Sequence, residues 1–186
     1  MPAQPTRVHY SHVKTRHVGD VWFAESDRGL WRITFGSSRT RFLNELAGDG
    51  IAAVPDERRT AATRKALVDY FNGRTRTFDR KLDWSRLRGF DRKALRVCAR
   101  IPYGKTLSYG EIARRAGSPG GARAAGQAMG KNPFPIIVPC HRVVKSDGTI
   151  GGFGGGLHHK RALLELEEIE LPGEQPSARS LSRRTR

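Results

Sequence analysis

The segment from Ser108 to Met129 constrains the fold most, because it predicts two short helices joined by a tight turn. Ser108-Tyr109-Gly110-Glu111 has the Ser-x-x-Glu spacing of a capping box, in which both side chains satisfy free backbone amides at a helix start. Gly117 to Gly120 interrupts the first helix, and Ala122 to Met129 forms the second. A helix, a short glycine-containing turn and a second helix are the helix-turn-helix pattern.

The second of these helices is poorly equipped to read bases in the major groove. Arg123 and Gln127 are its only long polar side chains between Ala122 and Met129. Its alanines and glycines instead allow a close backbone approach to DNA, as in a shallow contact with the minor groove. Small residues also suit a tightly packed internal helix, so the composition leaves both interpretations open.

The charge of the chain favours a polyanionic partner. Its 186 residues include 34 Lys and Arg against 18 Asp and Glu, a formal net charge of +16, which favours nucleic acid or an anionic membrane. The longest apolar run, around Ile136–Val138, is too short to cross a bilayer, and Met1 to Pro5 has no apolar stretch typical of a secretory signal. We therefore expect a cytoplasmic protein with no membrane partner.

Two cysteines are too few for a disulfide framework or a four-thiolate zinc site. A reducing, intracellular setting fits this count. His9, His12 and His17 match no common zinc spacing and have no thiolate nearby, so they are interpreted as surface residues. No metal site is predicted.

The first half of the chain predicts an α/β (α+β) domain with a small antiparallel sheet. Val21 to Phe35 is interpreted as a hairpin that turns near Asp27-Arg28-Gly29, because apolar and polar residues alternate in its second arm. Helices are predicted over 39–46 and 57–71, and a strand is predicted over 77–82.

A change of composition near Ser85 divides the chain. We predict the α/β domain over 1–84, a mainly helical domain containing the helix-turn-helix over 85–171, and a disordered basic tail rich in Pro, Ser and Arg over 172–186. The second domain has four further predicted elements: a helix over 90–100, a buried strand over 136–138, a glycine-rich loop over 151–156 and a last helix over 158–169.

Cys140 and His141 are adjacent in this second domain and suggest a nucleophile with a base. A thiol becomes a good nucleophile when its pKa falls and a base is near. Neighbouring side chains need not face each other, so a bridging water is one route for the proton. Glu167 follows Leu163 by four residues and Leu164 by three, on the same helix face. It is either paired there, for example with a histidine base, or half exposed at the helix edge.

The run Pro139-Cys140-His141-Arg142-Val143, with Ile136–Val138 before it and the glycine-rich loop after it, resembles the methylated-DNA–protein-cysteine methyltransferases, the O6-alkylguanine-DNA alkyltransferases. The resemblance extends from Phe90 to Glu167. Its further motifs are, in chain order, Ile101-Pro102-Tyr103-Gly104, Ser108-Tyr109, Ala122-Arg123-Ala124, Asn132-Pro133 and Leu163-Leu164-x-x-Glu167.

The resemblance implies roles for individual residues. Cys140 would accept the alkyl group, His141 would act as base through a water, and Glu167 would orient His141. Asn132 would join the DNA-binding turn to the active-site turn, and Tyr109 would hydrogen-bond the flipped guanine and protonate it as it leaves. The remaining implied residues are Val143, Phe153 and Gly154 in the guanine pocket with Tyr109, and Gly121, Ala122, Arg123 and Ala124 on DNA, where Arg123 replaces the extruded base.

By the same resemblance, the chain is an enzyme that repairs DNA by direct transfer of a methyl or other alkyl group from guanine O6, with thymine O4 as a further candidate. The nucleotide must be flipped out of the stack to expose this atom. Because the thioether formed at Cys140 has no easy route back to a thiol, each molecule would act once. No cofactor is implied. The expected partner is double-stranded DNA containing O6-alkylguanine, bound by a monomer associated with the nucleoid.

Phe153 stands where the family usually has tyrosine, so a hydroxyl at the pocket mouth is missing. This departure motivates an alternative, a protein that binds alkylguanine with little or no transfer, although Cys140 is retained. A transcription regulator is disfavoured by the small side chains of the second helix, and a cysteine hydrolase by the lack of an oxyanion-hole signature. The strongly basic character is an individual feature, which should strengthen nonspecific DNA binding.

Overall fold

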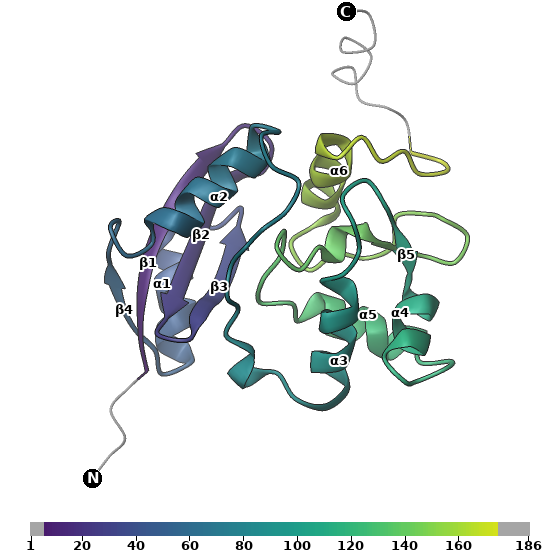
Figure 1. Ribbon diagram of the computed structural model, residues 1–186, viewed down its shortest axis with the longest axis horizontal. Coiled ribbons are helices and arrows are strands. Elements are labelled where there is room, and N and C mark those ends of the chain that lie inside the picture. Colours follow the sequence, from purple (N-terminus) through teal and green to yellow (C-terminus); the bar gives the residue numbers. More distant parts are fainter. Residues whose placement is uncertain (1–5, 175–186) are drawn as a thin grey trace, which may run out of the picture. The chain divides into compact units, whose positions relative to one another are not determined.

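The computed structural model describes residues 6–174, and the chain forms two compact units that divide after Arg86 (Figure 1). The first unit is built on a sheet with two helices, and the second is mainly helical. Residues 175–186 of the predicted basic tail lie outside the described residues. Within the described range, no helix is long and apolar enough to cross a membrane.

A four-stranded sheet forms the centre of the first unit. Its strands are β1 (Arg7–Thr15), β2 (Gly19–Ser26), β3 (Gly29–Phe35) and β4 (Ala52–Pro55), in the order β3-β2-β1-β4. The predicted hairpin is confirmed as β2 and β3, and β1 pairs antiparallel with β2. The short strand β4 was not predicted, and it runs parallel to β1. The sheet is therefore mixed rather than purely antiparallel.

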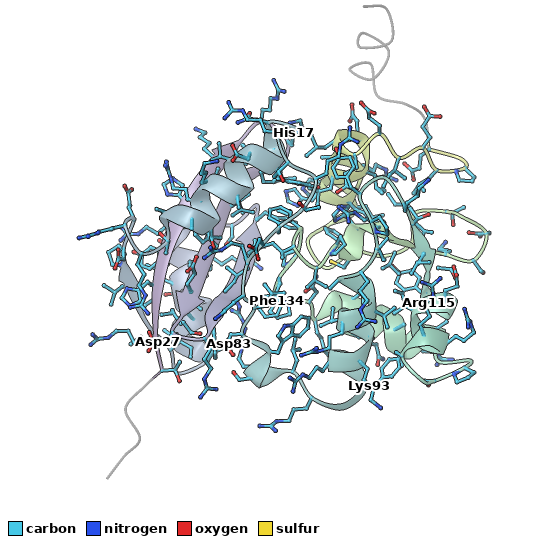
Figure 2. The ribbon with its side chains drawn as sticks, viewed as in Figure 1. His17, Asp27, Asp83, Lys93, Arg115 and Phe134 are labelled. Carbon is cyan, nitrogen blue, oxygen red and sulfur yellow. The ribbon has the colours of Figure 1, made fainter. Side chains whose placement is uncertain are left out.

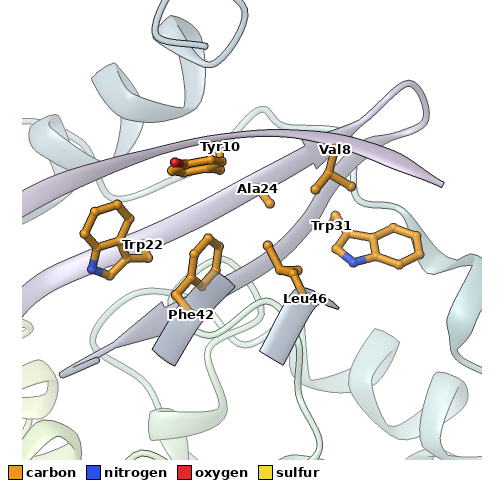
Figure 3. Close-up of a cluster of buried hydrophobic side chains, with 7 residues drawn as sticks. All are labelled: Val8, Tyr10, Trp22, Ala24, Trp31, Phe42 and Leu46. Atoms are coloured by element: carbon orange, nitrogen blue, oxygen red, sulfur yellow. The ribbon is translucent and has the colours of Figure 1, made fainter. Parts of the chain in front are cut away.

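Two helices cover opposite faces of this sheet (Figure 1). Helix α1 (Arg39–Gly48) inserts Phe42 and Leu46 into a core cluster (Figure 3), whose other members are Val8, Tyr10, Trp22, Ala24 and Trp31. Helix α2 (Ala61–Phe71) contacts β1 and buries Leu67, Tyr70 and Phe71. It begins four residues later than predicted, because residues 57–60 form a turn in which the Thr60 amide and hydroxyl both donate to Asp56 O.

The predicted strand over 77–82 is wrong. Of these residues only Leu82 pairs with the sheet, in a single bridge to Leu30. Leu30 N donates to Lys81 O at 2.8 Å, and Leu30 O accepts from Asp83 N at 2.8 Å. Gly29 allows this close approach, because a Cβ on Gly29 would collide with the Lys81 carbonyl. The short 3-10 helix η1 (Trp84–Arg86) then ends the first unit.

Three helices of the second unit pack against one another: α3 (Gly89–Cys98), α4 (Tyr109–Arg115) and α5 (Ala122–Gly130). The predicted capping box is confirmed, because Ser108 Oγ accepts from Glu111 N at 3.1 Å and Glu111 Oε2 accepts from Ser108 N at 3.4 Å. Helices α4 and α5 form the helix-turn-helix. Helix α6 (Leu157–Leu166) ends earlier than predicted, with Glu167 as its cap.

The predicted strand at 136–138 is wrong in conformation, although Ile136 and Val138 are buried. The chain turns instead, with Val138 N donating to Phe134 O at 2.8 Å and Ile136 at φ +78°. Pro135 and Pro139 flank the segment, and proline has no amide to donate to a ladder. The two strands of this unit are β5 (Leu107–Ser108) and β6 (Val143–Val144), paired in parallel. This pairing places the start of α4 beside the segment that follows Cys140.

Candidate active site

Cys140 is buried at the start of the short 3-10 helix η2 (Cys140–Arg142). Asn132, which follows α5, donates from Nδ2 to Val138 O at 2.8 Å and to Cys140 Sγ at 3.1 Å. The Asn132 Oδ1 atom accepts from Phe134 N at 3.0 Å, which fixes the orientation of the amide. One side chain therefore ties the turn after α5 to the turn that carries the thiol.

The environment of Cys140 keeps its thiol protonated at neutral pH. Burial raises the pKa of Cys140 to about 11, and the Asn132 hydrogen bond and the charge of Lys160 offset this only in part. Burial also raises the pKa of the other thiol, Cys98, which is fully buried in α3. Because the thiolate is the reactive form, Cys140 needs a base to act as a nucleophile.

His141, which follows Cys140 in the sequence, forms a buried pair with Glu167. The His141 Nε2 atom lies 2.9 Å from Glu167 Oε1, and both side chains are inaccessible to solvent. An ionised carboxylate only accepts hydrogen bonds, so Nε2 carries the proton and Nδ1 keeps its lone pair. The Nδ1 atom is buried and has no hydrogen-bond partner in the described part of the chain. Burial lowers the pKa of His141, which keeps the ring neutral at pH 7 and able to accept a proton.

Arg142 completes this pair and was missed by the sequence reasoning. Its Nε donates to Glu167 Oε2 and its Nη2 to Oε1, each at 2.7 Å, while Nη1 donates to Ile101 O at 2.5 Å. Burial alone would raise the pKa of Glu167, but the hydrogen bonds from His141 and Arg142 hold it at about 2. A signal was present, because apolar residues precede and follow the His141-Arg142 pair, and a charged side chain buried in such a segment must be paired.

Lys160 is a second buried cation that the sequence reasoning missed. This residue of α6 is fully buried and donates from Nζ to Val143 O at 2.6 Å, to Ile150 O and to Gly152 O at 3.4 Å. Burial lowers the pKa of Lys160 to about 8. Its position three residues before Leu163, on the core face of the helix, could have indicated burial.

Tyr109, the first residue of α4, reaches the same loop. Its hydroxyl donates to Gly152 O at 3.0 Å, and Lys160 Nζ lies 5.8 Å from the centre of its ring. Burial raises the pKa of Tyr109 to about 12, so the hydroxyl keeps its proton. Gly151 leaves room for the ring, because a Cβ there would lie 2.8 Å from Tyr109 Cε2, and its φ of +63° also favours glycine.

The other predicted pocket residues lie on the segment held by Lys160. Val143 is buried in β6 opposite Leu107, Phe153 is half-buried and Gly154 is exposed. A Cβ on Gly154 would lie 3.0 Å from Gly130 O at the end of α5, so the glycine-rich loop approaches this helix closely. Sequence reasoning placed these residues in one pocket, and the structure brings their segments together around Tyr109.

The predicted DNA-contacting residues form a separate group at the start of α5. Gly121 is the residue that precedes the helix, Ala122 and Arg123 are exposed and Ala124 is half-buried. The opposite face of α5 is buried through Ala125, Ala128 and Met129. Small residues therefore allow close packing on the buried face of α5 and leave a low surface on its exposed face.

In residues 6–174, no group of three or more His, Cys, Asp and Glu side chains is arranged to hold a metal ion. The early histidines have other contacts. His9 Nδ1 lies 3.1 Å from Asp56 Oδ2, and the His12 ring stacks on Trp22 with centroids 4.5 Å apart.

Known proteins are similar to this chain in sequence and in fold. The family described as 6-O-methylguanine DNA methyltransferase, DNA binding domain, matches residues 89–169. The chain is 48% identical over 123 residues to the methylated-DNA–protein-cysteine methyltransferase of Mycobacterium bovis, covering 65% of this chain and 73% of that relative. With the methyltransferase of the same name from Methanosarcina barkeri it shares 37% identity over 154 residues, 83% of this chain and 94% of the relative.

A solved structure extends the similarity to the fold. The crystal structure of Mycobacterium tuberculosis OGT in complex with DNA matches with a TM-score of 0.71 at 40% identity, covering 87% of this chain and 93% of that chain. The chain belongs to the methylated-DNA–protein-cysteine methyltransferase family. The predicted fold class, an α/β first domain and a helical second domain with a helix-turn-helix, is confirmed by this match.

Proposed function

We propose that this protein repairs DNA by transferring a methyl or other alkyl group from guanine O6 to Cys140 Sγ, with thymine O4 as a further substrate. The observation that carries the proposal is the orientation of His141. Its Nε2 is held by Glu167, and its buried Nδ1 has no partner among residues 6–174, so it is free to accept the proton of a thiol that cannot ionise alone. Membership of the methyltransferase family supports the same chemistry.

In the proposed reaction, the damaged nucleotide is flipped out of the duplex into the pocket of Tyr109, Val143, Phe153 and Gly154. A water relays the thiol proton to His141 Nδ1. As Sγ attacks the alkyl carbon, the S–C bond forms, the C–O6 bond breaks and the electron pair leaves with guanine. Tyr109 protonates the leaving base and is reprotonated through solvent from His141. In the net reaction, the alkyl group moves from guanine O6 to Cys140 Sγ and the proton of the thiol moves to guanine. The stable thioether limits each molecule to one reaction.

Three further side chains have positioning roles in this scheme. Glu167 stabilises the imidazolium that forms, as the carboxylate of a catalytic triad does. Arg142 neutralises Glu167, so the pair does not hold His141 protonated before the reaction. Asn132 orients the thiol through its hydrogen bond to Sγ.

The proposed partner is double-stranded DNA containing O6-alkylguanine. The exposed start of α5 would lie in the minor groove, where Gly121, Ala122 and Ala124 permit close approach. Arg123 would fill the space left by the extruded base. We expect a monomer that needs no cofactor and acts in the cytoplasm on nucleoid DNA.

The alternative, lesion binding with little or no transfer, has less support. Phe153 removes one hydroxyl from the pocket, but the acceptor Cys140 is present and accepts a hydrogen bond from Asn132, and His141 and Glu167 form a hydrogen-bonded pair. We therefore assign Phe153 to the choice of alkyl groups rather than to a loss of transfer.

A mass measurement tests the proposal directly. After incubation with duplex DNA containing O6-methylguanine, the peptide with Cys140 should be heavier by one methyl group, and the lesion should be converted to guanine. Cys140→Ser should abolish both changes, whereas Cys98→Ala, which removes the other buried thiol, should retain them. An unmodified Cys140 after long incubation with excess lesion would refute transfer, and tight lesion binding in that case would favour the alternative.

A further inference from the structure

Four arginines follow one line along helix α3. Arg88, Arg92, Arg96 and Arg100 are spaced four residues apart, from the residue before the helix to the turn after it, and all four are exposed. Residues four apart are neighbours on a helix surface, and the line spans about 18 Å at 1.5 Å per residue. We call these residues the arginine stripe.

Helix α3 contains a single acidic residue. This residue is Asp91, and its Oδ2 lies 3.2 Å from Lys131 Nζ. Arg92 and Arg96, the two members of the stripe inside α3, are like charges four residues apart on one helix surface. A surface of this kind fits a partner with regularly repeated negative charges.

The basic surface continues past the end of α3. Arg100, Lys105 and Arg115 line one small hollow between the end of α3 and the end of α4. Arg115 Nη2 lies 3.3 Å from Glu111 Oε1, which neutralises part of its charge. Lys93 and Arg115 are labelled on α3 and α4 in Figure 2. Helix α4 is the first helix of the helix-turn-helix, the helix that crosses the DNA backbone in that motif.

We propose that the arginine stripe, extended by Lys105 and Arg115, is a second contact surface for the phosphate backbone of duplex DNA, apart from the start of α5. This inference rests on the proposed function in one respect, because both take duplex DNA as the partner. Guanidinium groups match phosphates with paired hydrogen bonds, and a duplex carries a charge about every 1.7 Å along its axis. Along one strand this spacing is about 3.4 Å, so an 18 Å stripe, at about 1.5 Å per residue, spans about five phosphates of one strand.

The salt dependence of binding to an undamaged duplex tests this surface in the full-length protein. Neutralisation of three phosphate contacts in Arg92→Gln/Arg96→Gln/Arg100→Gln should reduce the slope of log K against log salt by about 0.9 per lost contact, or 2 to 3 in total. The matched control is Lys14→Gln/Arg58→Gln/Arg64→Gln, which removes the same charge from exposed positions of the first unit and should change the slope by less than about 1.

Two further measurements separate a contact from damage to the fold. The glutamine variant should have a Tm close to that of the wild type, because all three substituted side chains are exposed. Arg92→Lys/Arg96→Lys/Arg100→Lys, which keeps the charge, should keep most of the slope. An unchanged slope in the glutamine variant, an equal loss in the control or an equal loss in the lysine variant would overturn the proposal. These binding measurements use undamaged DNA and do not involve methyl transfer. A failure of the proposed function would be seen separately, as an unmodified Cys140 in the mass measurement.

Discussion

Arg142 holds Glu167 by two hydrogen bonds of 2.7 Å, one to each carboxylate oxygen, while His141 contacts only Oε1. The carboxylate is therefore neutralised by arginine and oriented toward histidine. Burial lowers the pKa of His141 even though a carboxylate lies 2.9 Å away, and the charges of Arg142 and Lys160 act in the same direction. A neutral histidine with a fixed tautomer is the form that a general base requires.

Loss of the guanidinium should destabilise the protein and change the charge of His141. Arg142→Gln removes the cation that neutralises the buried Glu167 carboxylate, which should lower the free energy of unfolding by about 3–5 kcal/mol. It should also raise the pKa of His141, because burial remains the largest cause of the lowering but one of the two positive charges that add to it is removed. Urea denaturation and an NMR titration of His141 measure the two effects. Arg161→Gln, which breaks the exposed pair with Glu174, is the control and should leave both values near those of the wild type. Equal losses in the two variants would contradict this account.

The rate of methyl transfer should depend on pH through His141. The neutral ring is the base, and its pKa lies below the usual 6.5, so the rate should stay level at neutral and mildly alkaline pH and fall only below 6.5. In His141→Ala the thiol must ionise without help at a pKa of about 11, so the rate at pH 7 should fall about 10²–10⁴-fold and rise steadily with pH. Single-turnover assays from pH 5 to 10 distinguish the profiles. A variant profile parallel to that of the wild type would remove His141 from the proton transfer.

Two adjacent glycines should respond differently to alanine. A methyl group at Gly151 would lie 2.8 Å from the Tyr109 ring and would impose a φ of +63° on a residue with a Cβ. Gly151→Ala should therefore displace Tyr109 and slow transfer, whereas Gly152→Ala meets nothing within 4 Å and should stay close to wild type. Single-turnover rates and the Tm of both variants test this difference. Similar rates in the two variants would separate Tyr109 from the reaction.

Lys160 should influence both the loop and the thiol. In Lys160→Met the carbonyls of Val143, Ile150 and Gly152 lose a buried donor, which should cost about 1–3 kcal/mol of unfolding free energy. The pKa of Cys140 should rise further, because the charge of Lys160 lowers it in the wild type. Denaturation and the pH dependence of Cys140 alkylation by iodoacetamide measure these effects. Lys145→Met removes an exposed lysine from the same segment and should change neither, so a matching loss there would contradict the assignment.

Local patterns predicted the elements that depend on local chemistry. The capping box at Ser108 and Glu111 and the hairpin around Asp27-Arg28-Gly29 form because hydrogen bonds close in sequence favour them. The segment at 136–138 shows the limit of such patterns. Apolar residues indicated burial correctly, but a buried turn and a buried strand have the same composition, and Ile136 takes a positive φ that no pattern of apolar residues encodes.

The sequence predicted the site residues that belong to a motif. It missed the residues that join the site only through contacts with distant parts of the chain. Cys140, His141, Asn132 and Glu167 were named from the sequence, and the structure places them in contact through two hydrogen-bonded pairs. Arg142 and Lys160 were left out because charged residues are normally exposed. Their partners, Glu167 and the carbonyl of Val143, are 25 and 17 residues away in the sequence, beyond the reach of helix or strand periodicity.

The burial of Cys140 also determines how the protein withstands oxidants. A thiol whose pKa is about 11 is ionised in only about one molecule in ten thousand at pH 7. Oxidation to sulfenic acid and exchange with other disulfides both proceed through the thiolate at accessible sites. A protein that reacts only once has no means of renewing its cysteine. A thiol that stays inert until a base and a substrate act on it therefore preserves the supply of unreacted molecules between one lesion and the next.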